Sequence, residues 1–254
     1  MSHRTEISRC LFLTWTGGAI FCPSQLFAKN ENMVPSNLDH ILLGTYELQR
    51  GIDFVKKRTG VRAQFGGVHP GRGTQNALLS LGGRRYLEII APDPAQPHVK
   101  NRVAKGLRSL QGNALLGWAA HVDDLSVLAD RLRAVGVIYS GPTPGSRKRP
   151  DGGVLEWKTL ELADTASDIL PFFIEWAPGT IHPSVDAPKG CSLARFSAET
   201  PDSKQTITAL KALGLDLSVS RGSPAETIFR CVVEGPKGKL EVNSTPLLHL
   251  LGVL

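Results

Sequence analysis

The sequence predicts an α+β fold in which βαβββ units are repeated in tandem, and three observations support this class. Three amphipathic segments, at residues 48–59, 124–135 and 201–213, repeat apolar residues with the 3.6-residue period of a helix. Each segment ends at a glycine followed by an aliphatic residue, which is typical of a left-handed helix cap. Downstream of each glycine, by 28, 39 and 27 residues, a glutamate lies inside an apolar strand. Internal repetition of this kind indicates one structural unit used three times.

The first predicted unit covers residues 37–91. Its opening strand contains the apolar run at 38–43, interrupted by one histidine and one aspartate. The helix at 48–59 has its leucine, isoleucine and valine on one face and ends at Gly60. The unit closes with the strand Tyr-Leu-Glu-Ile-Ile at residues 86–90.

The second predicted unit covers residues 116–177 and the third covers residues 191–245. The second unit is longer because of an expected insertion at 142–153, which is dense in glycine, proline and basic residues. In the third unit Pro201 suits the first turn of the helix. Two linkers join the units, at residues 92–117, where a short helix is expected near 99–110, and at residues 177–190.

Length and composition exclude several classes of protein. The chain has 254 residues, of which 41% are hydrophobic and 20% charged, so it has enough apolar surface to fold. The net charge is +6, but basic and acidic residues are interspersed, without the basic stripe and stacking aromatics of a nucleic-acid interface. No apolar run is long enough to span a bilayer. We therefore expect neither a nucleic-acid partner nor a membrane span.

The N-terminal segment, residues 1–28, has the pattern of an export signal. Arg4 and Arg9 precede an apolar stretch at 11–21, and Ala28 provides a small residue for cleavage. Such a signal would place the protein in the periplasm or outside the cell. The alternative is a disordered tail, with which the protein would be cytoplasmic.

The cysteines leave two possibilities open. No C-x-x-C pair is present, so neither a zinc knuckle nor a thioredoxin-type site is expected. Outside the N-terminal segment only Cys191 and Cys231 remain. They either form a disulfide in an oxidising compartment or remain as two buried thiols.

Two glutamates in apolar strands are the main candidates for chemistry. Glu88 and Glu175 each have apolar neighbours on both sides, and burying an unpaired carboxylate costs several kcal/mol. A divalent metal, an arginine or a proton would satisfy such a group, whereas a structural ion pair or a solvated sheet face would give the same pattern without a functional site. Strand alternation turns Glu88 away from its leucine and isoleucine neighbours, towards a concave surface. His40, in the opening strand, is a candidate metal ligand for the same surface.

A glycine-rich segment at residues 66–73 surrounds His69. Such a segment can bring backbone N–H groups close to an anion, although plain hairpin turns have the same composition. Arg147 and Arg149 form part of a short basic run that could hold a carboxylate or a phosphate. The candidate substrate-binding residues are Thr74, Asn76, Arg147, Arg149 and Trp157.

In these motifs the chain resembles the glyoxalase-like domain family of the vicinal oxygen chelate superfamily. The resemblance is carried by Leu38-Asp39-His40-Ile41-Leu42-Leu43, the glycine-rich segment 66–76, Tyr86-Leu87-Glu88, Gly117-Trp118-Ala119, Arg149-Pro150-Asp151-Gly152 and Pro171-Phe172-Phe173-Ile174-Glu175-Trp176. It implies paired units whose mixed sheets curl around a central groove that holds a small molecule. Members of the superfamily include metal-dependent isomerases, dioxygenases and ligand-sequestering resistance proteins.

The resemblance also implies a metal site with His40 and Glu88 as its first half. In the second unit the position equivalent to His40 falls near residues 116 and 117, where no side chain can bind a metal. The expected ligands are therefore His40, Glu88 and Glu175, with His69 as a further candidate. These nitrogen and oxygen donors suit Zn, Fe, Mn, Co or Ni.

The leading hypothesis is a metal-dependent isomerase or lyase that acts on a small substrate with adjacent oxygens. The metal would stabilise an enolate-like intermediate, and Glu175 or His69 would move the proton. The first alternative is a metal-free protein that binds or sequesters a small molecule in the same groove, lined by Trp118, Trp157 and Trp176. In a third version the glutamates only pair with arginines. Because the third unit can take the place of a partner subunit, a monomer is favoured.

Overall fold

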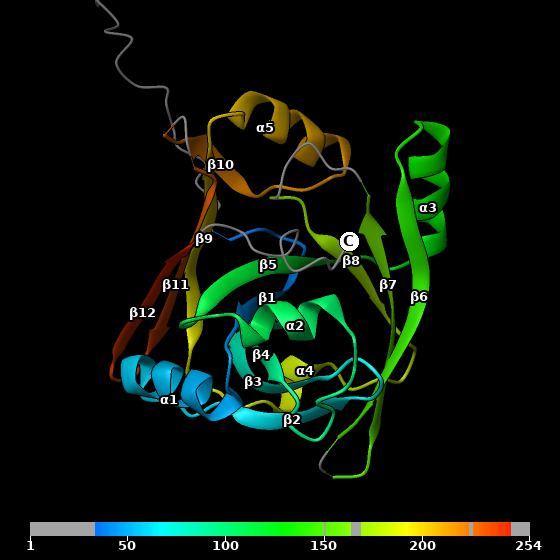
Figure 1. The fold of residues 1–254 in the computed structure, drawn as a ribbon. Coiled ribbons are helices and arrows are strands. Elements are labelled where there is room, and N and C mark those ends of the chain that lie inside the picture. Colours follow the sequence, from blue (N-terminus) through cyan, green and yellow to red (C-terminus); the bar gives the residue numbers. More distant parts are fainter. Residues whose placement is uncertain (1–33, 150, 164–168, 224–225, 245–254) are drawn as a thin grey trace, which may run out of the picture. The chain divides into compact units, whose positions relative to one another are not determined.

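The computed structural model describes residues 34–149, 151–163, 169–223 and 226–244 (Figure 1). The expected export signal at 1–28 lies outside the described residues. The described part contains two β-sheets, one of eight strands and one of four, together with five helices. This arrangement is the α+β class expected from the repeats.

The first two βαβββ units share one order of elements and one order of strands. The first consists of β1 (Leu38–Gly44), α1 (Leu48–Thr59), β2 (Gln64–His69), β3 (Thr74–Gly82) and β4 (Arg85–Pro92). The second consists of β5 (Ala114–His121), α3 (Leu125–Ala134), β6 (Tyr139–Lys148), β7 (Val154–Leu162) and β8 (Phe172–Trp176). In each unit the first strand pairs in parallel with the fourth, and the remaining pairs are antiparallel. An antiparallel contact of β1 with β5 joins the units into one mixed sheet, which is curled (Figure 1).

The helices lie where the periodicity predicts them. The segment predicted at 48–59 is α1, whose Leu48, Ile52 and Val55 side chains are buried. The capping glycines that follow the three helices all have positive φ, which an L residue with a side chain rarely adopts. These are Gly60 at 85°, Gly136 at 73° and Gly214 at 73°.

The predicted insertion at 142–153 is in large part regular structure. Residues up to Lys148 belong to β6, which pairs with β7 in a long hairpin. The prolines within β6, Pro142 and Pro144, are tolerated because β6 is the edge strand of the sheet. The extra length of the second unit is therefore mostly a longer hairpin.

The third unit repeats the order of elements but not the order of strands. It consists of β9 (Ser192–Thr200), α5 (Ser203–Ala212), β10 (Ser218–Arg221), β11 (Ile228–Gly235) and β12 (Gly238–Ser244). Its sheet has the order β10-β9-β11-β12, so β9 lies between β10 and β11 instead of beside the last strand. The unit is thus related to the other two in sequence order and differs from them in strand pairing.

One continuous core joins the two sheets. Trp118 of β5 is fully buried, and its ring lies 6.0 Å from that of Phe196 in β9. The indole nitrogen of Trp118 donates to the carbonyl of Ile169 at 2.8 Å. The prediction that Trp118 lines the groove is therefore wrong, because its side chain packs on the opposite face of the curled sheet. Cys191 and Cys231 are both buried, free thiols.

Two short helices from the linkers close around the first unit. Helix α2 (Arg102–Arg108) lies in the linker predicted to be helical, and its Leu107 packs on Leu42, Ile90 and Leu116. Helix α4 (Pro183–Asp186) lies beside β3, where the Ser80 hydroxyl donates to the carbonyl of Ser184 at 2.9 Å. The linker between the second and third units thus returns to the first unit.

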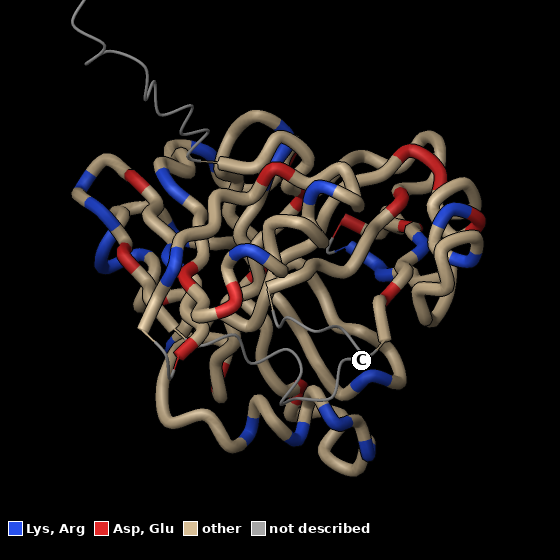
Figure 2. Tube along the Cα trace, turned by 90° about the horizontal axis from the view of Figure 1, so that it is seen from above, with Lys and Arg blue, Asp and Glu red and all other residues tan. Residues whose placement is uncertain are grey.

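Charged residues of both signs are interspersed along the described trace (Figure 2). No helix in the described part of the chain is both long and apolar enough to cross a membrane.

Candidate functional site

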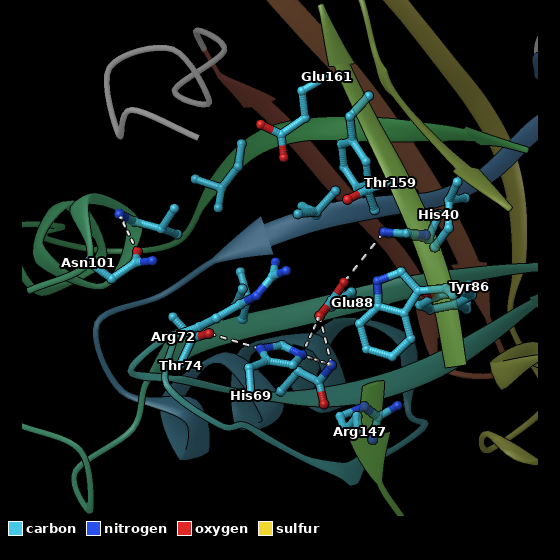
Figure 3. A pocket seen from close by; sticks show the side chains of 18 of the residues that line it. His40, His69, Arg72, Thr74, Tyr86, Glu88, Asn101, Arg147, Thr159 and Glu161 are labelled. Carbon is cyan, nitrogen blue, oxygen red and sulfur yellow. Dashed lines mark hydrogen bonds and ion pairs between the residues drawn. The ribbon is translucent and has the colours of Figure 1, made fainter. Parts of the chain in front are cut away.

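A cavity of about 150 Å³ lies between the first two units (Figure 3). The first unit contributes a mostly polar wall from β1 to β4, and the second unit contributes the facing wall from β6, β7 and β8. Asn101, which precedes α2, and Val103, which lies within α2, close one end of the cavity. The cavity therefore occupies the groove expected between tandem units.

Strand alternation decides which side chains reach this cavity. In β4, Tyr86, Glu88 and Ile90 line it, whereas Leu87 and Ile89 belong to the core. Eight of the residues singled out in the sequence line the cavity: His40, His69, Thr74, Asn76, Glu88, Arg147, Trp157 and Trp176.

Glu88 is the centre of a polar network on the first-unit wall. Its Oε1 accepts a hydrogen bond from Asn76 Nδ2 at 2.7 Å, and its Oε2 lies 3.5 Å from His40 Nε2. Burial works to raise the pKa of this carboxyl, but electrostatic interactions with the His40 and His69 rings and the Asn76 hydrogen bond outweigh it. The pKa of Glu88 therefore lies below its usual value, and the group is ionised near neutral pH.

Asp39 contacts the His40 ring on the side away from Glu88 and fixes its orientation. The sequence analysis did not include Asp39 as a site residue. The buried Asp39 carboxylate lies 2.7 Å from His40 Nδ1 and 3.1 Å from His182 Nε2, and it accepts from Trp176 Nε1 at 2.9 Å. Burial opposes its ionisation, but the hydrogen bonds from His182 and His40 outweigh burial, so the pKa of Asp39 is well below its ordinary value. His40 consequently has one ring nitrogen facing Asp39 and the other facing Glu88 and the cavity.

His69 is held in the neutral form by its surroundings. Its Nδ1 lies 2.8 Å from Thr74 Oγ1, and its Nε2 lies 3.3 Å from Asn76 Nδ2. Burial, opposed by Glu88 and helped by nearby Arg147, lowers the pKa of His69 to about 4. Because both ring nitrogens are already engaged, the expected role of His69 in proton transfer is not supported by this geometry. Its side chain instead orients Thr74 and Asn76.

The lowered pKa of His69 predicts a loss of stability in mild acid. Between about pH 6.5 and pH 4 the unfolded chain binds a proton here that the folded protein does not, so unfolding becomes easier as the pH falls. At ~1.4 kcal/mol per pH unit, the free energy of unfolding should fall by about 2 kcal/mol from pH 6.5 to pH 5 through this residue. Urea unfolding at both pH values measures the change.

The matched comparison uses two histidine variants. His69→Gln should remove most of this pH dependence, whereas His121→Gln should retain it, because His121 lies outside the cavity and faces the exposed Asp123. Asp39 and Glu88 do not contribute to this change. Their pKa values are lowered in the folded protein, so protonation of these groups reduces the free energy of unfolding only once the pH falls below the pKa of an ordinary carboxyl. The prediction would be contradicted if the free energy of unfolding changed with pH equally in the wild type and in His69→Gln.

Glu175 does not join His40 and Glu88, which corrects the expected ligand set. Its neighbours Ile174 and Trp176 face the cavity, so alternation turns Glu175 to the outer face of β8. There its Oε2 accepts from the backbone N–H of Leu125 at 2.8 Å, and its Oε1 lies 3.4 Å from Lys158 Nζ. Glu175 thus satisfies a free N–H at the start of α3, where a negative charge is also favoured.

Arg149 is likewise outside the cavity. Its guanidinium pairs with Asp186 of α4 and lies 3.4 Å from Asp151. The predicted anion clamp of two arginines is therefore reduced to Arg147. Arg72, from the glycine-rich segment, supplies a second cavity-lining cation that the sequence did not single out.

Glu161 is the carboxylate that the second unit places in the cavity. Trp157, Thr159 and Glu161 of β7 share the cavity face, while Leu160 and Leu162 belong to the core. Figure 3 shows Glu161 on the side of the cavity away from His69 and Arg147. Burial raises the pKa of Glu161, and nearby Arg72 only partly offsets this. The alternation of side chains along β7 could have identified Glu161 from the sequence, because Glu161 lies four residues after Trp157 and therefore on the same face of the strand.

The donor set does not fit the divalent metal that the resemblance implies. His40 and Glu88 provide two donors, but β8 presents Phe172, Ile174 and Trp176 to the cavity where a carboxylate was expected. In the described residues no group of three His, Cys, Asp or Glu side chains is placed to hold an ion. A catalytic metal normally has three protein ligands.

Comparison with known proteins identifies the family. The family described as "Glyoxalase-like domain" matches residues 38–214. A hypothetical protein from Staphylococcus aureus has a similar crystal structure, with 16% identity, a TM-score of 0.55, and coverage of 84% of this chain and 86% of that one.

Two methylmalonyl-CoA epimerases are more distant in structure. The Mycobacterium tuberculosis enzyme is 23% identical, with 56% of this chain and 89% of that one covered and a TM-score of 0.42. The Streptomyces coelicolor enzyme, in complex with 2-nitronate-propionyl-CoA, is 19% identical, with 56% and 97% covered and a TM-score of 0.42. No curated protein is significantly similar in sequence. The family match spans most of the chain, and the chain therefore belongs to the glyoxalase-like domain family.

Proposed function

We propose that the protein is a small-molecule enzyme of the isomerase or lyase type, which moves a proton on a carbon next to a carbonyl group. One observation supports this proposal above the others. The cavity holds two carboxyl groups in different electrostatic states, Glu88 with a lowered pKa and Glu161 with a raised one. Carboxyl groups whose environments drive their pKa values apart are typical of acid–base catalysis.

In this proposal Glu161 is the proton acceptor. A carboxylate with a raised pKa is a stronger base than Glu88, whose ionised form is held by Asn76 and His40. As Glu161 removes the proton, the C–H electron pair moves onto the carbonyl oxygen and forms an enolate. Protonation at a different atom, or on the opposite face of the same carbon, gives an isomer, and loss of a substituent from the neighbouring carbon gives a lyase product.

The cations and donors of the cavity would stabilise this enolate. Arg72 acts electrostatically on both Glu161 and His69, which places positive charge between the two walls. The other residues of the second-unit wall, including Phe172, Ile174 and Trp176, are mainly apolar and exclude water from the substrate.

Metal dependence remains a prediction, with His40 and Glu88 as the two available ligands. Metal analysis of the purified protein and of His40→Ala, after reconstitution with Zn, Fe, Mn, Co or Ni, tests it. No step of the proposed reaction requires the ion.

Deuterium incorporation tests the proposed activity without knowledge of the product. The protein is treated with chelator and incubated in D₂O with 2-oxo acids, 2-hydroxy acids, aldehydes and ketones, and loss of the α-proton signal is followed by NMR. We expect enzyme-dependent exchange for at least one compound class, at a rate unchanged in His121→Gln. Absence of exchange in every compound that binds would refute the proposal.

The second candidate is a binding or sequestering protein, favoured by the aromatic residues in the cavity. The rings of Trp157 and Trp176 lie 5.7 Å apart on the second-unit wall, where they offer a surface for a ligand. Binding without exchange, seen as a rise in melting temperature that survives chelator, would select this function.

A further inference from the structure

Arg147 is a buried cation with no partner in the described part of the protein. Arg147 is only 4% exposed, yet its guanidinium forms no hydrogen bond or ion pair with any described residue. Its Nη1 atom is fully buried and unsatisfied. Burying a guanidinium costs several kcal/mol unless an anion or several acceptors compensate it. An anion that is not part of the chain would remove this cost.

The backbone around Arg147 is built to admit its side chain. A Cβ on Gly66 would lie 3.0 Å from Arg147 Nη1, and one on Gly67 would lie 3.1 Å from its Cγ and Cδ. The two glycines of β2 therefore leave room for the guanidinium between β2 and β6. Asn76 Oδ1, 2.5 Å from the same Cβ position of Gly66, is also buried and unsatisfied. An unpaired acceptor thus accompanies the unpaired donor at this end of the cavity.

The charges around Arg147 favour a singly charged anion. Glu88 acts on Arg147 electrostatically but lies beyond ion-pair distance, and its ionised carboxylate would repel a doubly charged phosphate. A carboxylate is planar and carries one charge, and a guanidinium can bind it through two parallel hydrogen bonds. A hydroxyl on the neighbouring carbon could donate to Asn76 Oδ1.

We infer that the ligand of this cavity is a small monocarboxylate whose carboxylate group binds to Arg147. The volume of about 150 Å³ limits the enclosed part of the ligand, since a cavity of this size holds about six to eight non-hydrogen atoms. The inference rests on the proposed function for the choice of cavity and deepens it by naming the substrate class. It would leave the reacting carbon of the ligand between Glu88 and Glu161 (Figure 3).

Calorimetry and thermal unfolding with a defined panel test this inference. The panel contains the carboxylates from acetate to hexanoate, their 2-oxo and 2-hydroxy derivatives, the matching methyl esters and amides, and inorganic phosphate. We expect at least one carboxylate to bind about ten- to a hundred-fold more tightly than its ester or amide, and more tightly than phosphate. Arg147→Met should lose this preference, and the control Arg149→Met should keep it, because Arg149 lies outside the cavity.

A second readout separates ligand binding from a structural role. Because the Arg147 guanidinium has no partner among the described residues, Arg147→Met should unfold at the same temperature as the wild type or at a higher one without ligand. A lower melting temperature with unchanged carboxylate affinity would overturn the inference. So would equal binding of esters and acids, tighter binding of phosphate, or no binding by any carboxylate of the panel.

The proposed function can fail independently of this inference. Carboxylate binding through Arg147 without deuterium exchange would refute the proposed reaction and leave the ligand class intact. Exchange confined to neutral aldehydes and ketones, and unaffected by Arg147→Met, would support the proposed reaction and refute the inference that the ligand is a carboxylate.

Discussion

Replacing Asp39 with alanine is expected to lower the free energy of unfolding by about 3–5 kcal/mol, because it removes one partner of a buried charged network. The Asp39 carboxylate is 1% exposed and faces His40, His182 and the indole N–H of Trp176. Alanine would leave all three polar groups buried without their common acceptor. Urea unfolding near neutral pH measures the change, and His40 should at the same time lose its fixed orientation.

Asp93→Ala is the matched control for this prediction. Asp93 is also buried, at 4% exposure, but its described hydrogen bonds come from neutral groups, Gln96 Nε2 and the backbone of Ala95. Its loss should cost only about 1–3 kcal/mol. A double-mutant cycle between Asp39→Ala and His182→Ala should show coupling well above that of distant residues. Equal losses for both aspartates, with no coupling to His182, would contradict the assigned network.

The cycle with His182 also tests how the second linker takes part in the site. His182 precedes α4, in the connection between the second and third units, and its contact with Asp39 spans 143 positions of the chain. Nothing in the local sequence indicates such a contact, because it depends on the return of the linker to β3. This explains why sequence reasoning assigned no role to His182.

The fold was predictable because its signals are local. Helix period and the capping glycines at 60, 136 and 214 depend only on the residues around them, and they placed the helices within a few positions. The strand order of the third unit is not local, because β9 pairs both with β10 and with β11, which follow it at a distance along the chain. The order of elements was therefore visible in the sequence, and the strand order of the third unit was not.

The two glutamates show where pattern reasoning about a site ends. Glu88 and Glu175 have the same local pattern, a carboxylate between apolar residues, yet only Glu88 faces the cavity. In β4 the apolar neighbours face the core, whereas in β8 the neighbours Ile174 and Trp176 face the cavity. A shift of one residue in register exchanges the two faces of a strand, and register is decided by pairing across the sheet.

Asp39 was missed for a different reason. Strict alternation would place consecutive residues 39 and 40 on opposite faces of β1, out of contact. The structure has a register shift between Leu38 and His40 in the pairing of β1 with β5, and here the two side chains meet. Such an irregularity has no marker in the sequence, because neither glycine nor proline occurs at this point.

Replacing Glu161 with glutamine is expected to slow deuterium exchange by about 10²–10⁴-fold, the usual contribution of a general base. The amide keeps the shape of the side chain but cannot accept the proton, so carboxylate affinity at Arg147 should change little. The measurement is the NMR exchange rate at saturating ligand, combined with calorimetric affinity. A loss of affinity as large as the loss of rate would show that Glu161 binds the ligand and does not move its proton.

The pH dependence provides an independent check on this role. Since burial raises the pKa of Glu161, the wild-type exchange rate should increase with pH through a range above that of an ordinary glutamate, as the base form appears. Glu161→Gln should lack this increase. Glu175→Gln is the matched control, because its carboxylate lies on the outer face of β8 and accepts from Leu125, so both the rate and the profile should persist. If Glu175→Gln abolished the exchange and Glu161→Gln did not, the base would have to be sought outside the cavity, and the separation of the two glutamates by strand register would lose its functional meaning.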